Sequence, residues 1–165
     1  MTRTGHRLLG ASCGLAVATV AGQAAVMAVA VATVAAVVAP WPDVDQRSWW
    51  KPLARFHRAF RHRRLTHWWG LPTALLPVLF FLPGPTLWLL AAPLAGWYSH
   101  LLGDWVFGKR GPAVTGWRGP GIPLAPWWGY HGLGLKCGGT AERYGAWPAL
   151  GLALVVQSAV LTGIV

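Results

Sequence analysis

Seven side chains of the metal-binding type lie at the polar ends of apolar segments. The chain has only four acidic residues and six histidines. Seven of these ten residues share this placement: His6, Asp43, Asp45, His62, His67, His100 and Asp104. Imidazole and carboxylate groups together suit a divalent metal ion, and a chain so poor in acids has little reason to keep carboxylates beside apolar helices without a charged partner. We therefore predict that these residues form a metal site.

The number of candidates exceeds the four ligands that one zinc ion takes, so either two or more metals bind or some of the seven orient the ligands through hydrogen bonds. Zinc is the first expectation, while manganese, iron and magnesium also accept such groups. A metal-activated water would make the site hydrolytic, with Asp45 or Asp104 accepting a proton or bridging two metals. Arg63 is placed to contact an anionic group, because guanidinium matches phosphate oxygens. The expected substrate is therefore a phosphoester, either a small molecule or a lipid.

The composition is that of an integral membrane protein. The chain has 165 residues, is 55% hydrophobic and has a mean hydropathy of +0.44, which predicts one membrane-embedded domain over residues 1–165. The formal charge of +10 could also indicate a nucleic-acid binder, but the basic residues flank long apolar runs. The two cysteines, Cys13 and Cys137, offer neither a disulfide framework nor a paired-thiol motif.

The first apolar run, residues 8–38, carries no charge. It is too long for the core of a signal peptide, which has about 7–15 residues, so we expect it to remain uncleaved. As one helix it would be about 46 Å long, against a hydrocarbon core of about 30 Å. Because Gly22 and Gln23 lie near its midpoint, we predict a hairpin of two short helices, with one overlong span as the alternative.

Three further segments complete the predicted all-α, multi-pass membrane fold. Residues 71–82 and 86–102 are apolar and flank a Pro-Gly-Pro sequence, which predicts a second hairpin. Residues 51–64 have the pattern of a basic amphipathic helix on an anionic lipid surface. Residues 1–104 would thus hold the metal-site core of two hairpins, 105–145 a Gly/Pro-rich irregular loop, and 146–165 a C-terminal transmembrane helix.

The positions of the positive charges support this arrangement. All fourteen Lys and Arg residues lie in 1–7, 47–64 or 109–143, and none lies at either hairpin tip. With two hairpins every basic residue lies on one side, which the positive-inside tendency assigns to the cytoplasm. The same geometry brings the ends of both hairpins to one membrane face, whereas a straight helix would hold His6 and Asp43 tens of Å apart. The hairpin and the metal site therefore imply each other.

Several of these motifs together resemble a known family. They are Gly5-His6, Pro42-Asp43-Val44-Asp45, the segment HRRLTH at 62–67, the segment SHLLGD at 99–104 and the segment GIPL at 121–124. Their order and spacing are similar to those of the YdjM-like family of LexA-regulated, predicted membrane-bound metal-dependent hydrolases. The resemblance implies an inner-membrane protein of bacteria and a distant kinship with zinc-dependent phospholipase C and single-strand nucleases. Arg64 replaces a usual glycine and Trp68 a usual small hydroxyl residue, and both lie beside the expected pocket.

Two other functional classes are compatible with the sequence. One is a non-catalytic membrane scaffold with a structural metal site, in which the basic helix binds anionic lipid or nucleic acid. A catalytic site keeps an open coordination position and a structural site is closed, so metal spectroscopy separates the two. The other is a transporter, which the absence of charge within the apolar runs disfavours.

Overall fold

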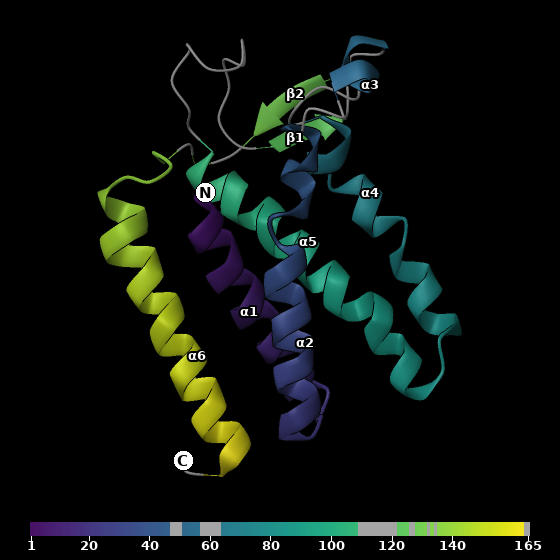
Figure 1. Cartoon of the computed structure of the whole chain (residues 1–165), viewed down its shortest axis with the longest axis vertical. Coiled ribbons are helices and arrows are strands. Elements are labelled where there is room, and N and C mark those ends of the chain that lie inside the picture. The colour runs from purple at the N-terminus through teal and green to yellow at the C-terminus, as the bar shows by residue number, and fades with distance from the viewer. Residues whose placement is uncertain are drawn as a thin grey trace.

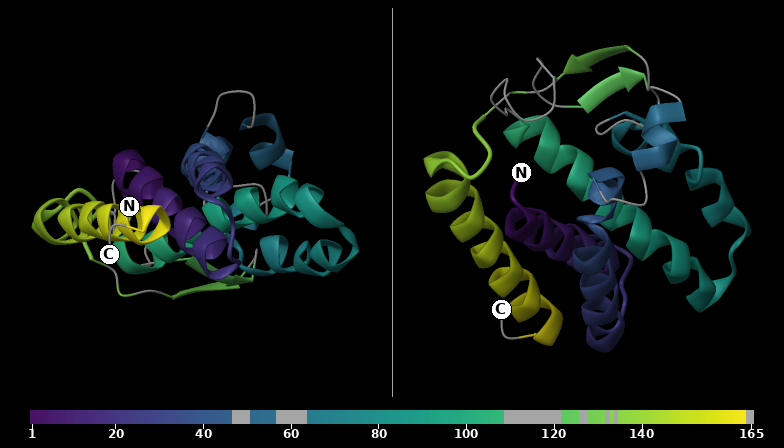
Figure 2. Two further views of the ribbon diagram at one scale, coloured as in Figure 1. Left: turned by 90° about the horizontal axis from the view of Figure 1, so that it is seen from below. Right: turned by 45° about the horizontal axis from the view of Figure 1, so that its top comes forward.

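A computed structural model describes residues 1–46, 51–56, 64–108, 122–125, 128–131, 133 and 135–163, and for Asp45 it describes the backbone alone. Helices make up most of this part of the chain (Figures 1 and 2). The prediction of a helical fold with two hairpins, a basic helix and a C-terminal apolar helix is confirmed, and one short pair of strands is added to it.

The first apolar run folds back on itself. It forms helix α1, Arg3–Val20, and helix α2, Ala25–Val38, which pack against each other along their lengths. The run is therefore a hairpin, and the single overlong span is wrong.

Glycine makes the turn of this hairpin possible. Gly22 has a φ of 67°, in the left-handed region that residues with a Cβ rarely adopt. Its amide donates a hydrogen bond to the Thr19 carbonyl at 2.9 Å, and the Gln23 amide donates one to the Ala18 carbonyl at 3.0 Å. This pair of bonds closes the end of α1 in the Schellman arrangement and sends the chain back towards its start.

The second hairpin is less regular than the first. Its returning arm is helix α5, Leu87–Phe107, which extends beyond the predicted end at residue 102. Its first arm consists of helix α4, Gly70–Thr73, and a 3₁₀ helix at Leu76–Phe81, because its prolines lack the amide hydrogen that a longer α-helix needs. A second 3₁₀ helix, Gly84–Thr86, forms the turn before α5. The arm still folds back on α5, where the Thr73 hydroxyl and the Tyr98 hydroxyl lie 2.8 Å apart.

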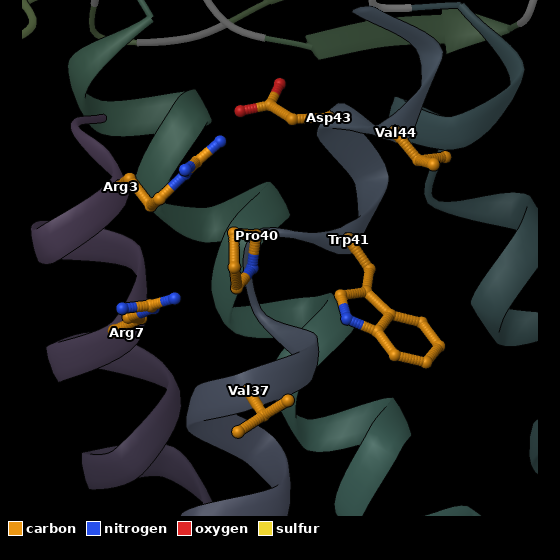
Figure 3. A pocket seen from close by; sticks show the side chains of 7 residues that line it. All are labelled: Arg3, Arg7, Val37, Pro40, Trp41, Asp43 and Val44. Atoms are coloured by element: carbon orange, nitrogen blue, oxygen red, sulfur yellow. The ribbon is translucent and has the colours of Figure 1, made fainter. Parts of the chain in front are cut away.

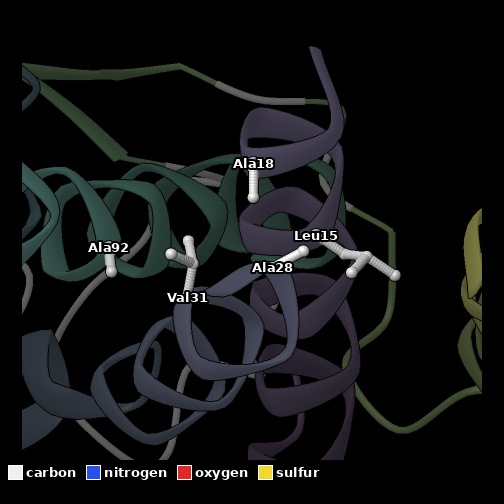
Figure 4. Packing of buried hydrophobic residues seen from close by; sticks show 5 residues of the cluster. All are labelled: Leu15, Ala18, Ala28, Val31 and Ala92. Carbon is white, nitrogen blue, oxygen red and sulfur yellow. The ribbon is translucent and has the colours of Figure 1, made fainter. Parts of the chain in front are cut away.

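Small side chains let α1, α2 and α5 approach closely. The core cluster consists of Leu15, Ala18, Ala28, Val31 and Ala92 (Figure 4). A Cβ at Gly96 of α5 would lie 2.4 Å from the Ala35 carbonyl oxygen of α2, and one at Gly10 of α1 would lie 2.7 Å from the same oxygen. Glycine at both positions therefore sets the spacing of the three helices, as is typical of helices packed within a membrane.

The remaining elements lie around this three-helix unit. Helix α3, Lys51–Phe56, begins the predicted basic helix, and residues 57–63 lie outside the described part. Strands β1, Ile122–Ala125, and β2, Trp128–His131, pair antiparallel in a region where the sequence predicts only irregular loops. A π-helix at Ala141–Ala146 leads into helix α6, Trp147–Thr162, which packs against α1.

Two apolar helical segments are long enough to cross a membrane. They are Ala25–Val44, which is α2 with the residues that follow it, and Ala141–Thr162, which is the π-helix together with α6. None of the residues of α6 is buried, and Leu152 and Val155 are 65% and 66% exposed. An apolar helix with so much exposed surface suits an apolar surrounding such as a lipid bilayer.

Candidate metal centre

The folded hairpins bring five of the seven predicted ligands together. His6 lies in the first turn of α1, Asp43 in the 3₁₀ helix Trp41–Gln46 that follows α2, and His67 at the end of the 3₁₀ helix Leu65–His67. His100 and Asp104 lie one turn apart near the end of α5. The ends of α1, α2 and α5 that carry these residues lie together, away from the loop that joins α1 to α2 (Figure 1).

Four of the five form a compact donor set. One ligand atom from each of Asp43, His67, His100 and Asp104 lies within 4.8 Å of the others. His67 Nε2 lies 3.0 Å from His100 Nε2, 3.5 Å from Asp43 Oδ1 and 3.5 Å from Asp104 Oδ2. His100 Nε2 lies 3.7 Å from Asp104 Oδ2. Four tetrahedral ligands of zinc, each about 2.0–2.1 Å from the ion, lie about 3.3 Å from one another, so these separations fit a single metal ion.

The environment of the donor set supports the same conclusion. His67, His100 and Asp104 are at most 1% exposed, whereas the Asp43 side chain is 25% exposed. The buried Oδ1 atom of Asp43 has no hydrogen-bond partner among the residues that the structure describes. Buried polar atoms normally have a partner, and a cation suits an oxygen that faces an imidazole nitrogen. The residues present therefore fit a divalent metal.

Hydrogen bonds from neighbouring residues orient His67. The Thr66 hydroxyl lies 3.0 Å from His67 Nδ1, which directs Nε2 of the same ring towards the donor set. The Trp97 indole nitrogen donates a hydrogen bond of 2.9 Å to the Thr66 carbonyl. Partners of this kind fix the tautomer and the direction of a metal-binding imidazole.

His6 borders the donor set on the other side of Asp104. Its ring stacks on that of His100 with 3.9 Å between centroids, and its Nε2 lies 3.3 Å from Asp104 Oδ1. The amino group of Met1 lies 2.6 Å from the same oxygen. Asp104 thus presents Oδ2 to His67 and His100 and Oδ1 to two nitrogen groups. His6 is therefore placed to hold Asp104 in position or to serve a second metal.

Glu142 is a buried charged residue near the site that the sequence does not single out. Glu142 is fully buried and accepts hydrogen bonds from the Thr2 amide at 2.7 Å, the Gly138 amide at 2.8 Å and the Thr2 hydroxyl. It thereby ties the residues that precede His6 to the start of the C-terminal helix. The only signal in the sequence was that Glu142 is the fourth acid of a chain that has four.

Three predicted site residues stay predictions. His62 and Arg63 lie outside the described residues, and the Asp45 side chain does as well. The backbone of Asp45 lies in the same 3₁₀ helix as Asp43.

A cavity of about 490 Å³ opens beside the donor set (Figure 3). Asp43 belongs to its lining, together with Arg3 and Arg7 of α1 and an apolar wall. The partly exposed member of the donor set therefore faces a space large enough for a small molecule.

The fold and the donor set define a small helical protein with apolar helices able to cross a membrane and a buried group of imidazoles and carboxylates able to hold a metal. A family model described as YdjM inner membrane protein matches residues 1–163, so the chain belongs to this family of inner membrane proteins. No curated protein and no solved structure matches the chain.

Proposed function

We propose that the protein is a membrane-bound, metal-dependent hydrolase that acts on a phosphoester. The observation that carries the proposal is the donor set of Asp43, His67, His100 and Asp104, whose ligand atoms lie within 4.8 Å of one another. Two nitrogen and two oxygen donors favour zinc, while manganese, iron and magnesium remain alternatives.

Individual residues would have separate roles in the hydrolysis. A divalent metal at such a site lowers the pKa of a bound water and so supplies a nucleophile near neutral pH. Asp104 or Asp45 would accept the proton of that water, as a carboxylate within hydrogen-bond reach can do. Arg63 would bind an anionic group of the substrate. Asp43, one-quarter exposed beside the cavity, marks the side from which the substrate would enter.

We further propose that the protein crosses the membrane several times with its metal site on the cytoplasmic face. Arg3 and Arg7 lie in the first two turns of α1, and Arg3 lines the same cavity as Asp43 of the donor set. The turn at Gly22 and the Pro-Gly-Pro turn at 83–85 carry no charge. Positive residues are retained on the cytoplasmic side, so the metal site would lie there and the two turns outside.

Elemental analysis of the purified full-length protein tests the proposed site. The double variant His67→Gln/Asp104→Asn keeps side chains of similar size and replaces an imidazole and a carboxylate with neutral amides, which are much weaker ligands of zinc. Ser12→Ala, which changes a buried polar side chain of α1 outside the donor set, is the matched control. We expect bound metal in the wild type and in Ser12→Ala and its loss in the double variant. Equal metal content in all three proteins would refute the proposed metal site.

The same samples then enter a hydrolysis screen. The substrates are p-nitrophenyl phosphate, bis(p-nitrophenyl) phosphate and short-chain lipid phosphoesters. We expect turnover of at least one substrate by the wild type and by Ser12→Ala, and none by the double variant. Turnover that persists in a metal-free double variant would contradict a metal-dependent hydrolase.

The alternative is a non-catalytic scaffold that binds anionic lipid or nucleic acid and has a closed, structural metal site. The near-complete burial of His67, His100 and Asp104 is the observation that favours it. Cobalt substitution separates the two, because the visible spectrum of cobalt reports its ligands. A change of the spectrum on addition of phosphate would indicate an open coordination position and support the hydrolase. An unchanged spectrum would support the scaffold.

A further inference from the structure

Two arginines beside the donor set have no part in the metal site. Arg3 and Arg7 lie four residues apart on α1 and therefore on the same side of that helix. Both side chains are exposed, and in the part of the chain that the structure describes no carboxylate lies within 4.0 Å of either. Two neighbouring guanidinium groups, with no carboxylate that close among the described side chains, form a place where an anion is favoured.

Both guanidinium groups line the cavity of about 490 Å³ between α1 and the segment that follows α2. Figure 3 shows Arg3 directed from α1 towards Asp43 of that segment, with Arg7 one turn further along α1. The opposite wall is apolar and consists of Val37, Pro40, Trp41 and Val44. Cavities that bind small molecules typically measure about 300–1,000 Å³ and combine apolar walls with a few polar groups. This cavity is cationic on one side and apolar on the other, which suits an amphiphilic anion.

The cavity continues into an exposed apolar face of α2. Val26, Val29 and Val37 are 85%, 60% and 55% exposed, and Trp41 at the cavity is 62% exposed. They lie on one side of the apolar segment Ala25–Val44, which is long enough to cross a membrane. An acyl chain in the bilayer can therefore lie along α2 while the headgroup attached to it reaches the arginines.

Asp43 connects this cavity to the donor set, since it belongs to both. An anionic headgroup held by Arg3 and Arg7 would be next to the residues that hold the metal. The arrangement thus suits a phosphoester whose phosphate is attached to a lipid.

We propose that Arg3 and Arg7 bind the phosphate of a lipid phosphoester whose acyl chains lie along α2. This inference rests on the proposed function, because it assigns the substrate class of the same site. It adds Arg3 and Arg7 to Arg63, which lies in the segment 62–67, as residues that recognise the substrate.

Isothermal titration calorimetry in detergent tests the proposal without turnover. The probe is a phosphonate analogue of dioctanoyl phosphatidic acid, which cannot be hydrolysed at the headgroup. Dioctanoylglycerol lacks the phosphate, and inorganic phosphate lacks the lipid. We expect the phosphonate lipid to bind more tightly than either. Equal binding of dioctanoylglycerol would show that the arginines recognise nothing, and equal binding of inorganic phosphate would assign the cavity to a free anion; either result overturns the proposal.

Arg3→Gln/Arg7→Gln is the test variant, and Lys136→Gln/Arg143→Gln, which removes two exposed positive charges from the segment before α6, is the matched control. Loss of two charge-assisted contacts should weaken phosphonate binding by about 10-fold or more, while the control should bind like the wild type. Equal binding by the test variant and the control overturns the proposal.

A folding control and a second variant keep this test decisive. Metal content shows whether the glutamine variant is correctly folded. If it is not, Arg3→Lys/Arg7→Lys replaces it, and we expect weakened phosphonate binding because lysine lacks the planar fork of arginine; unchanged binding overturns the proposal. Arg-dependent binding by a protein without hydrolytic activity would refute the proposed function alone. Hydrolysis with Arg-independent binding would refute this inference alone.

Discussion

Gly96→Ala places one methyl group where α5 meets α2. The new Cβ would lie 2.4 Å from the Ala35 carbonyl oxygen, and real Cβ atoms essentially never approach closer than 3.0 Å. The two helices must therefore separate by at least about 0.6 Å, because a backbone oxygen within a helix cannot turn away. His100 and Asp104 follow Gly96 on α5, so this shift moves them away from Asp43.

The expected cost follows from this overlap. Inserting a methyl group into a packed core typically destabilises a protein by about 1–3 kcal/mol. Replacing glycine with alanine within a helix also stabilises the helix by about 0.5–1 kcal/mol, so the control must be a Gly→Ala change within another helix. Gly151→Ala of α6 is that control, since a Cβ there meets no atom within 4 Å. The difference in unfolding free energy between the two variants therefore measures the cost of the overlap alone.

Thermal unfolding in detergent measures the difference. For a chain of this size 1 kcal/mol corresponds to a Tm shift of about 2–4 °C, so Gly96→Ala should unfold several degrees below Gly151→Ala. Metal affinity should also fall in Gly96→Ala, because metal–ligand distances tolerate changes of only about 0.2 Å. Equal Tm and equal metal affinity in the two variants would refute the close packing of α2 on α5.

Three other predictions test the surroundings of the site, the stability of the fold and the membrane topology. Gly103→Val should lower metal affinity, because its Cβ would lie 3.2 Å from His6 Nδ1 and the branched side chain displaces that ring; metal titration measures this. Glu142→Gln should lower the free energy of unfolding by about 1–3 kcal/mol in a denaturant titration, because a neutral amide accepts hydrogen bonds less well than the buried carboxylate. In a cysteine-free background, Ala24→Cys and Thr86→Cys should react with an impermeant thiol reagent added outside the cell, and protection of either would contradict the proposed topology.

The first hairpin could be predicted because three signals agreed. The apolar run is longer than a bilayer requires, Gly22 lies at its midpoint, and positive charge is present at both of its ends but not between them. Together they predict a turn within residues 8–38, and the same turn places His6 near Asp43. Such reasoning succeeds where the length and charge of a segment leave few arrangements.

Other features depend on contacts between distant segments. Glu142 acts through Thr2, which is 140 positions away, and periodicity carries no information about such a contact. Arg3 and Arg7 look like ordinary membrane-flanking charges until the fold places them at a cavity that Asp43 also lines. The short strands β1 and β2 lie in a Gly/Pro-rich region, where the four-residue pattern of each strand is too short to be recognised.

X-ray absorption spectroscopy at the edge of the bound metal tests the central claim most directly, because it counts the ligand atoms of the purified protein. Coordination by the side chains of Asp43, His67, His100 and Asp104 predicts nitrogen and oxygen ligands at about 2.0–2.1 Å, with multiple scattering from two imidazole rings. The signal of one imidazole ring should disappear in His67→Gln. A sulfur ligand at about 2.3 Å, or a spectrum that His67→Gln leaves unchanged, would contradict a metal centre built from these four residues.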